Sequence, residues 1–160
     1  MLKPEQAISR VTRSKEEARV NYNRISKWYD IISNPAERKC RKLGLQKLGV
    51  RQGEIILEIG FGTGHGIVAL ARSAGESGKV YGIDISEKMH CITQERVKKN
   101  GLSERVELKC GDAARLPYAD NFFDAVFLSF TLELFDTPEI PVVLHECQRV
   151  LRSSGRICVT

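Results

Sequence analysis

The feature that most constrains the fold is the alternation of short apolar runs with helical patterns from residue 54 to residue 160. The first run, "EIILEIG", is nearly continuous, which is typical of a strand buried on both faces. The predicted strands cover residues 54–60, 79–85, 105–110, 122–130 and 156–160. Strands that alternate with helices through short links predict an α/β fold with a doubly wound, mostly parallel sheet and helices on both faces.

The helices between these strands are predicted from periodic apolar positions and from end signals. After the first strand, the apolar positions are Ile67, Val68, Leu70, Ala71 and Ala74. Ser86 can cap the next helix, which we expect to end near Asn100. The last helix opens at Thr137 and is expected to end at Gly155. Its apolar positions follow the 3.6-residue period and are Ile140, Val143, Leu144, Cys147, Val150 and Leu151.

Two further helices are predicted before the first strand. Ser14 and Glu17 fit a capping box, which marks the start of the first helix. Its apolar stripe contains Ala18, Tyr22, Ile25, Tyr29 and Ile32. Pro35 starts the second helix and Gly49 ends it. The apolar positions expected on one side of this second helix are Ala36, Cys40, Leu43 and Leu48.

The positive charge of the chain lies in its N-terminal segment. The net charge is +5, and residues 1–53 hold 13 Lys and Arg against 5 Asp and Glu. Such a segment can attract RNA, an acidic membrane surface or an anionic small molecule, or its charges can lie on solvated helix faces. No apolar stretch is long enough to span a membrane, and the start lacks the apolar core of a signal peptide. We therefore expect a cytoplasmic protein without a membrane span.

A glycine-rich loop, "GFGTGHG", follows the first strand at residues 60–66. Glycine at alternate positions lets a ligand lie against the backbone, and the helix that follows points free N–H groups at the same place. A P-loop is excluded because its spacing and its lysine are absent. A dinucleotide fingerprint fails at its third glycine, where His65 or Ile67 stands. The ligand therefore belongs to neither of these classes.

Four motifs in order resemble those of class I S-adenosylmethionine-dependent methyltransferases. They are "EIGFGTG" (58–64), "GIDIS" (82–86), "GDAARLPYADNFFDAV" (111–126) and "ECQRVLRSSGRICVT" (146–160). Within that superfamily, the chain looks most like the branch of the ubiquinone and menaquinone biosynthesis methyltransferases, whose aromatic N-terminal lead is similar to "YNRISKWYD" (22–30). The resemblance implies a Rossmann-like fold with strand order 3-2-1-4-5, S-adenosylmethionine as cofactor and a small-molecule methyl acceptor.

The resemblance also implies which residues hold the cofactor. They are Glu58, Gly60, Phe61, Gly62, Gly64, Asp84, Ile85, Asp112, Ala113 and Ser129. Glu58 is expected near the amino group of the methionine moiety, Asp84 at the ribose hydroxyls and Asp112 at the adenine amino group. Each of these acids also has a purely structural interpretation, as a helix cap, a turn residue or the partner of a lysine.

The acceptor is expected beyond the fourth strand. Phe130 and Thr131 follow that strand, where the methyl group should point, so we expect them to line the acceptor pocket. The resemblance suggests that Tyr22 and Tyr29 contact an apolar acceptor or cover the cofactor, unless the two tyrosines only dock their helix. No catalytic base stands out, and methyl transfer can proceed by orientation and exclusion of water. His65 and His145 are expected to be ordinary loop and surface residues. The scattered cysteines form no CxxC pair, so reduced thiols are favoured over a metal or redox site.

The chain departs from the family at its C-terminal end. Strands 6 and 7 of the family's sheet are missing, so the fifth strand is predicted to expose an edge at Ile157, Cys158 and Val159. This edge suggests a homodimer, a partner protein or a shortened form of a longer protein. We therefore divide the chain into an N-terminal basic helical lead or lid (1–53) and a truncated cofactor-binding domain (54–160). Two alternatives stay open: a catalytically silent domain that acts within a complex, and an RNA or protein methyltransferase that uses the basic segment.

Overall fold

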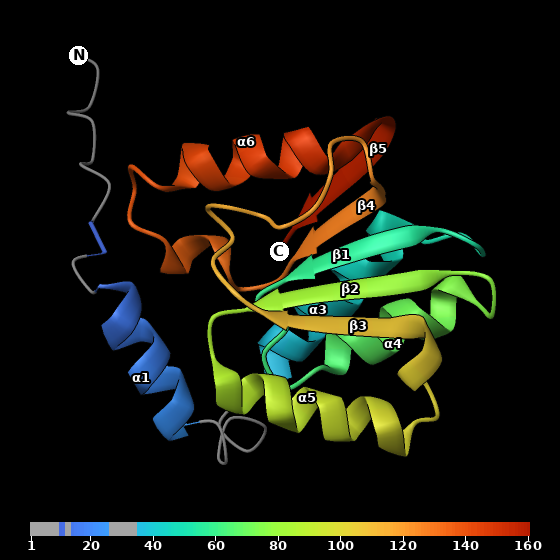
Figure 1. Cartoon of the computed structure of the whole chain (residues 1–160), viewed down its shortest axis with the longest axis horizontal. Helices are drawn as coiled ribbons and strands as arrows, with labels where there is room; N and C mark the ends of the chain where they lie inside the picture. Colours follow the sequence, from blue (N-terminus) through green and yellow to red (C-terminus); the bar gives the residue numbers. More distant parts are fainter. Residues whose placement is uncertain (1–9, 12–13, 26–34) are drawn as a thin grey trace.

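Five parallel strands in the order β3-β2-β1-β4-β5 form the centre of the computed structural model, which describes residues 10–11, 14–25 and 35–160 (Figure 1). The strands are β1 (Ile55–Ile59), β2 (Lys79–Asp84), β3 (Val106–Cys110), β4 (Phe123–Leu128) and β5 (Leu151–Val159). The helices are α1 (Lys15–Ile25), α3 (Pro35–Leu48), α4 (His65–Ala74), α5 (Glu87–Lys99) and α6 (Ile140–Val150). The predicted fold class and strand order are confirmed.

Helices cover both faces of the sheet and divide the core into two layers. On one face, Ile56 and Phe127 pack with apolar residues of α3, α4 and α5. On the other, Leu57 and Val126 pack with α6. Because side chains alternate along a strand, neighbouring residues of β1 and β4 enter opposite layers, and both strands are almost fully buried. This explains why their sequences are apolar throughout and do not alternate.

The junction of α6 and β5 differs from the prediction. The helix ends at Val150, and β5 begins at once, with Leu151 opposite Phe123 of β4. Ala125 is then opposite Arg156, so residues 152–155 form a bulge beside a single residue of β4. Arg152 pairs with Asp124 across this bulge. The prediction that Gly155 ends the helix is therefore wrong, because that glycine lies in the bulge.

The inward face of α3 also differs from the prediction. Ala36, Cys40 and Leu43 are exposed, whereas Gly44 and Leu48 are buried. A Cβ on Gly44 would lie 2.2 Å from Cγ2 of Thr160, so the helix approaches the sheet through its glycine. An apolar pattern cannot reveal such a contact, because glycine contributes no apolar side chain. Leu144 of α6 is likewise exposed, although Val143 and Cys147 are buried as expected.

Helix α1 lies beside the carboxyl ends of the strands, at the left of the view in Figure 1. Its predicted capping box is confirmed: the Ser14 N–H donates to Oε2 of Glu17 (2.7 Å), and the Glu17 N–H donates to Oγ of Ser14 (3.2 Å). Tyr22 lies on this helix and is half-buried. Tyr29 lies outside the described residues.

Candidate functional site

A pocket lies at the carboxyl ends of β1, β2 and β4, the edge at which parallel α/β sheets bind ligands. It encloses about 880 Å³ of empty space, part of which is open to solvent. The predicted site residues that line it are Tyr22, Gly60, Gly62, Asp84, Ile85, Asp112, Ala113, Ser129, Phe130 and Thr131. The loops singled out in the sequence therefore meet in one cavity.

Three glycines shape the loop between β1 and α4, and all three have positive φ, a conformation that favours glycine. A Cβ on Gly60 would lie 2.3 Å from Oγ1 of Thr131, and one on Gly64 would lie 2.5 Å from Cγ2 of Thr93. Gly62 is different, because no atom lies within 4 Å of the place where its Cβ would be. Two glycines thus allow close packing, and Gly62 leaves free space where the loop borders the pocket.

Asp84 ends β2 with only 9% of its surface exposed. Its Oδ2 accepts the N–H of Gly62 and its Oδ1 accepts the N–H of Ser86, each at 2.9 Å. Burial raises the pKa of Asp84, and these two backbone donors act against that rise. Each carboxylate oxygen retains a further lone pair, so the ionised group can accept two more hydrogen bonds, as from a pair of ribose hydroxyls.

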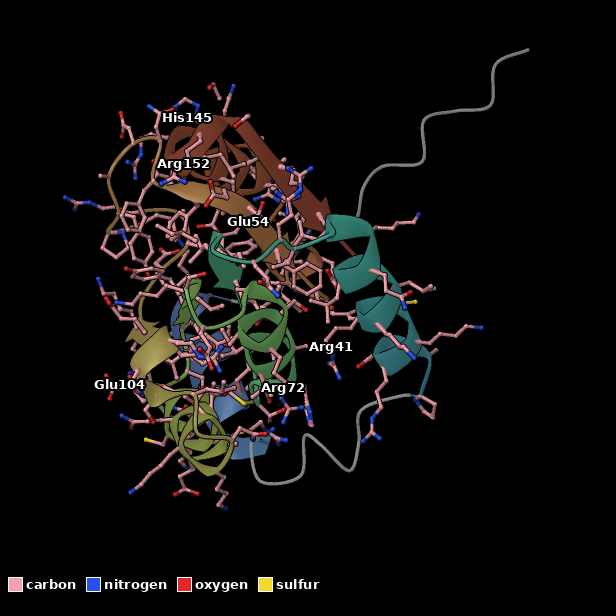
Figure 2. The ribbon with its side chains drawn as sticks, turned by 90° about the vertical axis from the view of Figure 1, so that its right-hand side faces the viewer. Arg41, Glu54, Arg72, Glu104, His145 and Arg152 are labelled. Carbon is pink, nitrogen blue, oxygen red and sulfur yellow. The ribbon has the colours of Figure 1, made fainter. Side chains whose placement is uncertain are left out.

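Glu58 is buried behind the pocket and does not line it. Its carboxylate lies against the first turn of α4, where a Cβ on Gly66 would be 2.0 Å from Oε1. Burial raises the pKa of Glu58 to about 8, opposed by the charge of Arg41, which reaches from α3 toward α4 (Figure 2). Oε2 has no hydrogen-bond partner. A buried, unpartnered carboxylate oxygen is rare in folded proteins, and a cationic ligand group would satisfy it.

Asp112 joins the pocket wall to helix α1. Its Oδ1 accepts the N–H of Ala114 (2.9 Å), and its Oδ2 pairs with Nζ of Lys15 (2.5 Å). The same ammonium group lies 2.8 Å from Oε1 of Glu139. Lys15 therefore bridges two acids that both line the pocket.

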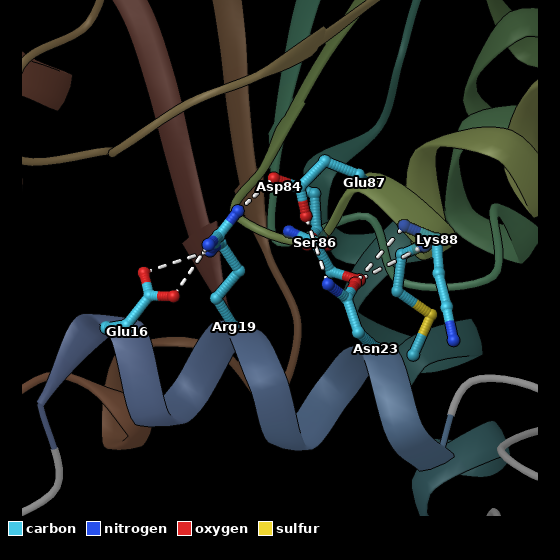
Figure 3. A network of polar contacts seen from close by, with 8 residues as sticks. Glu16, Arg19, Asn23, Asp84, Ser86, Glu87 and Lys88 are labelled. Atoms are coloured by element: carbon cyan, nitrogen blue, oxygen red, sulfur yellow. Dashed lines mark hydrogen bonds and ion pairs between the residues drawn. The ribbon is translucent and has the colours of Figure 1, made fainter.

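Further polar contacts attach the rest of α1 to the body of the protein. The Asn23 side chain accepts the Ser86 hydroxyl hydrogen at 2.6 Å, and Arg19 pairs with Glu87 (Figure 3). Before the helix, Arg10 pairs with Asp136 at 2.6 Å. Exposed pairs of this kind contribute about 0–1 kcal/mol each, so α1 is held by several weak contacts.

The segment after β4 forms the other wall of the pocket. Phe130 has φ 52°, a left-handed conformation that costs a non-glycine residue about 1–3 kcal/mol and is typical of functional loops. Its N–H donates to the Thr160 carbonyl at 2.8 Å. Thr131 is buried and donates its hydroxyl to the carbonyl of Ser129 at 3.0 Å. The apolar residues near this wall are Ala18, Tyr22, Leu134 and Phe135.

Three predicted cofactor residues, Glu58, Phe61 and Gly64, adjoin the pocket without lining it. The Phe61 ring is buried, with its centroid 6.4 Å from that of His90. The structure adds Lys15 and Thr93, which sequence reasoning missed. The sequence did contain a signal for Thr93, because this polar residue lies one helical turn from Met89 and one from Val97, the buried apolar residues of α5.

The two histidines considered from the sequence, His65 and His145, do not line the pocket. His65 is exposed at the start of α4, where its Nδ1 lies 3.4 Å from a guanidinium nitrogen of Arg96. His145 projects outward from α6 (Figure 2). Over residues 10–11, 14–25 and 35–160, no group of three His, Cys, Asp or Glu could hold a metal ion. Among those same residues, none of the helices has the length and apolar character needed to cross a bilayer.

The sheet order and the pocket at its carboxyl edge define a Rossmann-like fold with a ligand site. Residues 56–155 match the methyltransferase domain family. A crystal structure of a SAM-dependent methyltransferase from Aquifex aeolicus aligns with a TM-score of 0.70 and 28% identity, over 84% of this chain and 71% of that one. The cyclase SpnF aligns with a TM-score of 0.80 at 24% identity, over 92% of this chain and 60% of that one, a likeness of the fold alone.

The chain belongs to the methyltransferase domain family, because the match covers more than half of its length. Among curated relatives, a demethylmenaquinone methyltransferase of Lactobacillus johnsonii is 35% identical over 140 residues. That alignment covers 85% of this chain and 57% of the relative. The chain thus spans somewhat more than half the length of this relative.

Proposed function

We propose that the chain binds S-adenosylmethionine in the pocket at the carboxyl edge of the sheet. The observation that carries the proposal is that Asp84, Asp112 and the open Gly62 line one cavity, with the carboxyl group of Glu58 buried behind it. Asp84 has free acceptor capacity, Asp112 lines the same cavity, and Glu58 has an oxygen without a donor. These groups suit the ribose hydroxyls, the adenine amino group and the methionine ammonium, and free space beside Gly62 suits contact between ligand and backbone. The family match supports the same ligand.

We further propose that the reaction is methyl transfer to a small, neutral, largely apolar acceptor, such as a quinol ring. The apolar residues that line the pocket include Tyr22, Leu134 and Phe135, and the charged Lys15 and Asp136, which also line it, are engaged in ion pairs. An acceptor with its own charge would therefore find its partner already paired. The name of the Lactobacillus johnsonii relative supports a menaquinone-type acceptor.

The chemistry that the bound cofactor supplies is an electrophilic methyl group. The protein's part is to orient and to exclude water, which can contribute much of the acceleration of a bimolecular step. Phe130 and Thr131 line the wall next to β4, and the hydrogen bond from the Phe130 N–H to the Thr160 carbonyl holds that wall in place. We propose that α1 acts as a lid, because Lys15 joins it to Asp112 and Glu139, which both line the pocket.

The five free cysteines support a reducing, cytoplasmic setting.

A second candidate function, a cofactor-binding domain that needs a partner, is favoured by the edge of β5. Ile157 and Val159 of this strand are 42% and 45% exposed, and a second copy of the chain or another protein could extend the sheet there. Such a domain would bind the cofactor without transferring its methyl group. The activity measurement below separates the two functions.

The test is transfer of labelled methyl from S-adenosylmethionine. The purified chain is incubated with a reduced, short-chain demethylmenaquinone, with total tRNA, or with a cell extract, and label is followed in the organic, RNA and protein fractions. We expect label in the quinol only, and about 10- to 100-fold less of it with Asp84→Asn at cofactor concentrations below saturation. Label in RNA or protein would overturn the proposed acceptor. Cofactor binding without label in any fraction would favour the domain that needs a partner.

A further inference from the structure

Helix α5 holds the glycine loop through its buried face. Thr93 is fully buried, and its hydroxyl donates to the carbonyl of Gly62 at 2.8 Å. One turn further along, Nε of Arg96 donates to the carbonyl of Thr63 at 2.6 Å. Two successive carbonyls of the loop are therefore bound by α5.

The hydrogen bond of the Thr93 hydroxyl does not serve the backbone of its own helix. A threonine hydroxyl inside a helix usually bonds to the carbonyl three or four residues earlier in the same helix. Here it crosses to another element. Its neighbours on the inward face, Met89 and Val97, are apolar, so a valine would fill the same space. The hydroxyl is thus a specific polar group at a position that packing alone would make apolar.

Both backbone polar groups of Gly62 are bound as a result. Its carbonyl accepts from Thr93, and its N–H donates to Oδ2 of Asp84 at 2.9 Å. Gly62 has φ 51° and no side chain, so its peptide is held by these two hydrogen bonds and by the turn that the Gly64 N–H closes on the Phe61 carbonyl at 2.9 Å. The methyl group of Thr93 also occupies the space that a Cβ on Gly64 would need.

We propose that Thr93 is a positioning residue of the cofactor site. Its hydroxyl fixes the Gly62 peptide, and Gly62 in turn fixes the Asp84 carboxylate in the orientation that leaves its free lone pairs for the ligand. This inference rests on the proposed binding of S-adenosylmethionine. Thr93 does not touch the ligand; it acts through Gly62 and Asp84.

The test uses Thr93→Val, which removes the hydroxyl at nearly constant volume, and Thr93→Ser, which keeps it. Calorimetric titration with S-adenosylhomocysteine should show about tenfold weaker binding for the valine variant, because the Gly62 peptide without its donor leaves the binding orientation in the ligand-free protein and must be reoriented by the ligand. The serine variant should bind within about threefold of wild type, since it restores the bond. Val97→Ala is the matched control, because it lowers stability from the same face of α5 without a polar contact to the loop.

Hydrogen exchange of the ligand-free protein gives a second readout. In Thr93→Val, the Gly62 amide should exchange faster than in wild type, whereas Val97→Ala should leave it unchanged. The inference is overturned if Thr93→Val binds as wild type does, if Thr93→Ser fails to restore binding, or if Gly62 exchange is unchanged. Failure of wild type to bind would instead refute the proposed function, and exchange at Gly62 would still test the role of Thr93. If the valine variant does not fold, Thr93→Ala against Thr93→Ser makes the same comparison.

Discussion

Ionisation of the buried Glu58 should make the folded chain less stable as the pH rises. The pKa of this group is about 8 in the folded protein against a reference value of 4.5, so the folded state holds a proton that the unfolded state has lost throughout that interval. Stability from this group is complete below pH 4.5 and is lost progressively until the pH passes 8. Each pKa unit corresponds to about 1.4 kcal/mol, so the loss between pH 5 and pH 8 is about 3 kcal/mol.

The measurement is urea unfolding of wild type and Glu58→Gln at several pH values from about 5 to 8. Glutamine keeps the shape of the side chain and cannot ionise. Subtracting the free energies of unfolding of the two proteins at each pH therefore removes the contribution of the other titrating groups. We expect Glu58→Gln to gain about 3 kcal/mol relative to wild type across this range. Parallel curves for the two proteins would refute the reasoning, because they would mean that Glu58 ionises as freely in the folded state as in the unfolded one.

Three other outcomes follow from the contacts of the site. Binding of S-adenosylmethionine near pH 7 should release almost one proton from Glu58, which calorimetry in buffers of different ionisation enthalpy would detect, and Glu58→Gln should abolish this release. Lys15→Met should speed dissociation of S-adenosylhomocysteine several-fold in stopped-flow measurements, because α1 loses its ties to Asp112 and Glu139; an unchanged rate would argue against the lid. Gly66→Ala should lower stability by about 1–3 kcal/mol in urea unfolding, since its Cβ would overlap the Glu58 carboxylate, and a neutral effect would contradict that packing.

Much of the sheet could be predicted from sequence because its strands are short, apolar and separated by clear helix signals. The run at 54–60 and the cap at Ser86 are local features, and both elements form where they were expected. The junction at Gly155 could not be predicted, because it depends on the register in which β5 pairs with β4. Gly44 shows the same limit, since its role comes from Thr160, far away in the chain.

In the candidate site too, residues at strand ends could be predicted from local motifs, whereas residues that act through contacts between distant segments could not. The loops that carry Asp84 and Asp112 are fixed by strand ends, so motif spacing suffices to bring them to one cavity. Lys15 and Thr93 could not be placed by motif, because each acts through a contact between helices and loops distant in sequence. The position of Glu58 against Gly66 likewise depends on how α4 packs on β1, which no local pattern specifies.

The most direct test of the account is calorimetric titration of wild type and Asp84→Asn with S-adenosylhomocysteine. The asparagine removes the charge that receives the Gly62 and Ser86 N–H groups, together with one of the two acceptor oxygens. Hydrogen bonds to a charged group contribute about 1.5–3 kcal/mol, so we predict saturable binding by wild type and an affinity about 10- to 100-fold weaker in the variant. Absence of binding by wild type, or equal affinity of the two proteins, would contradict the central claim.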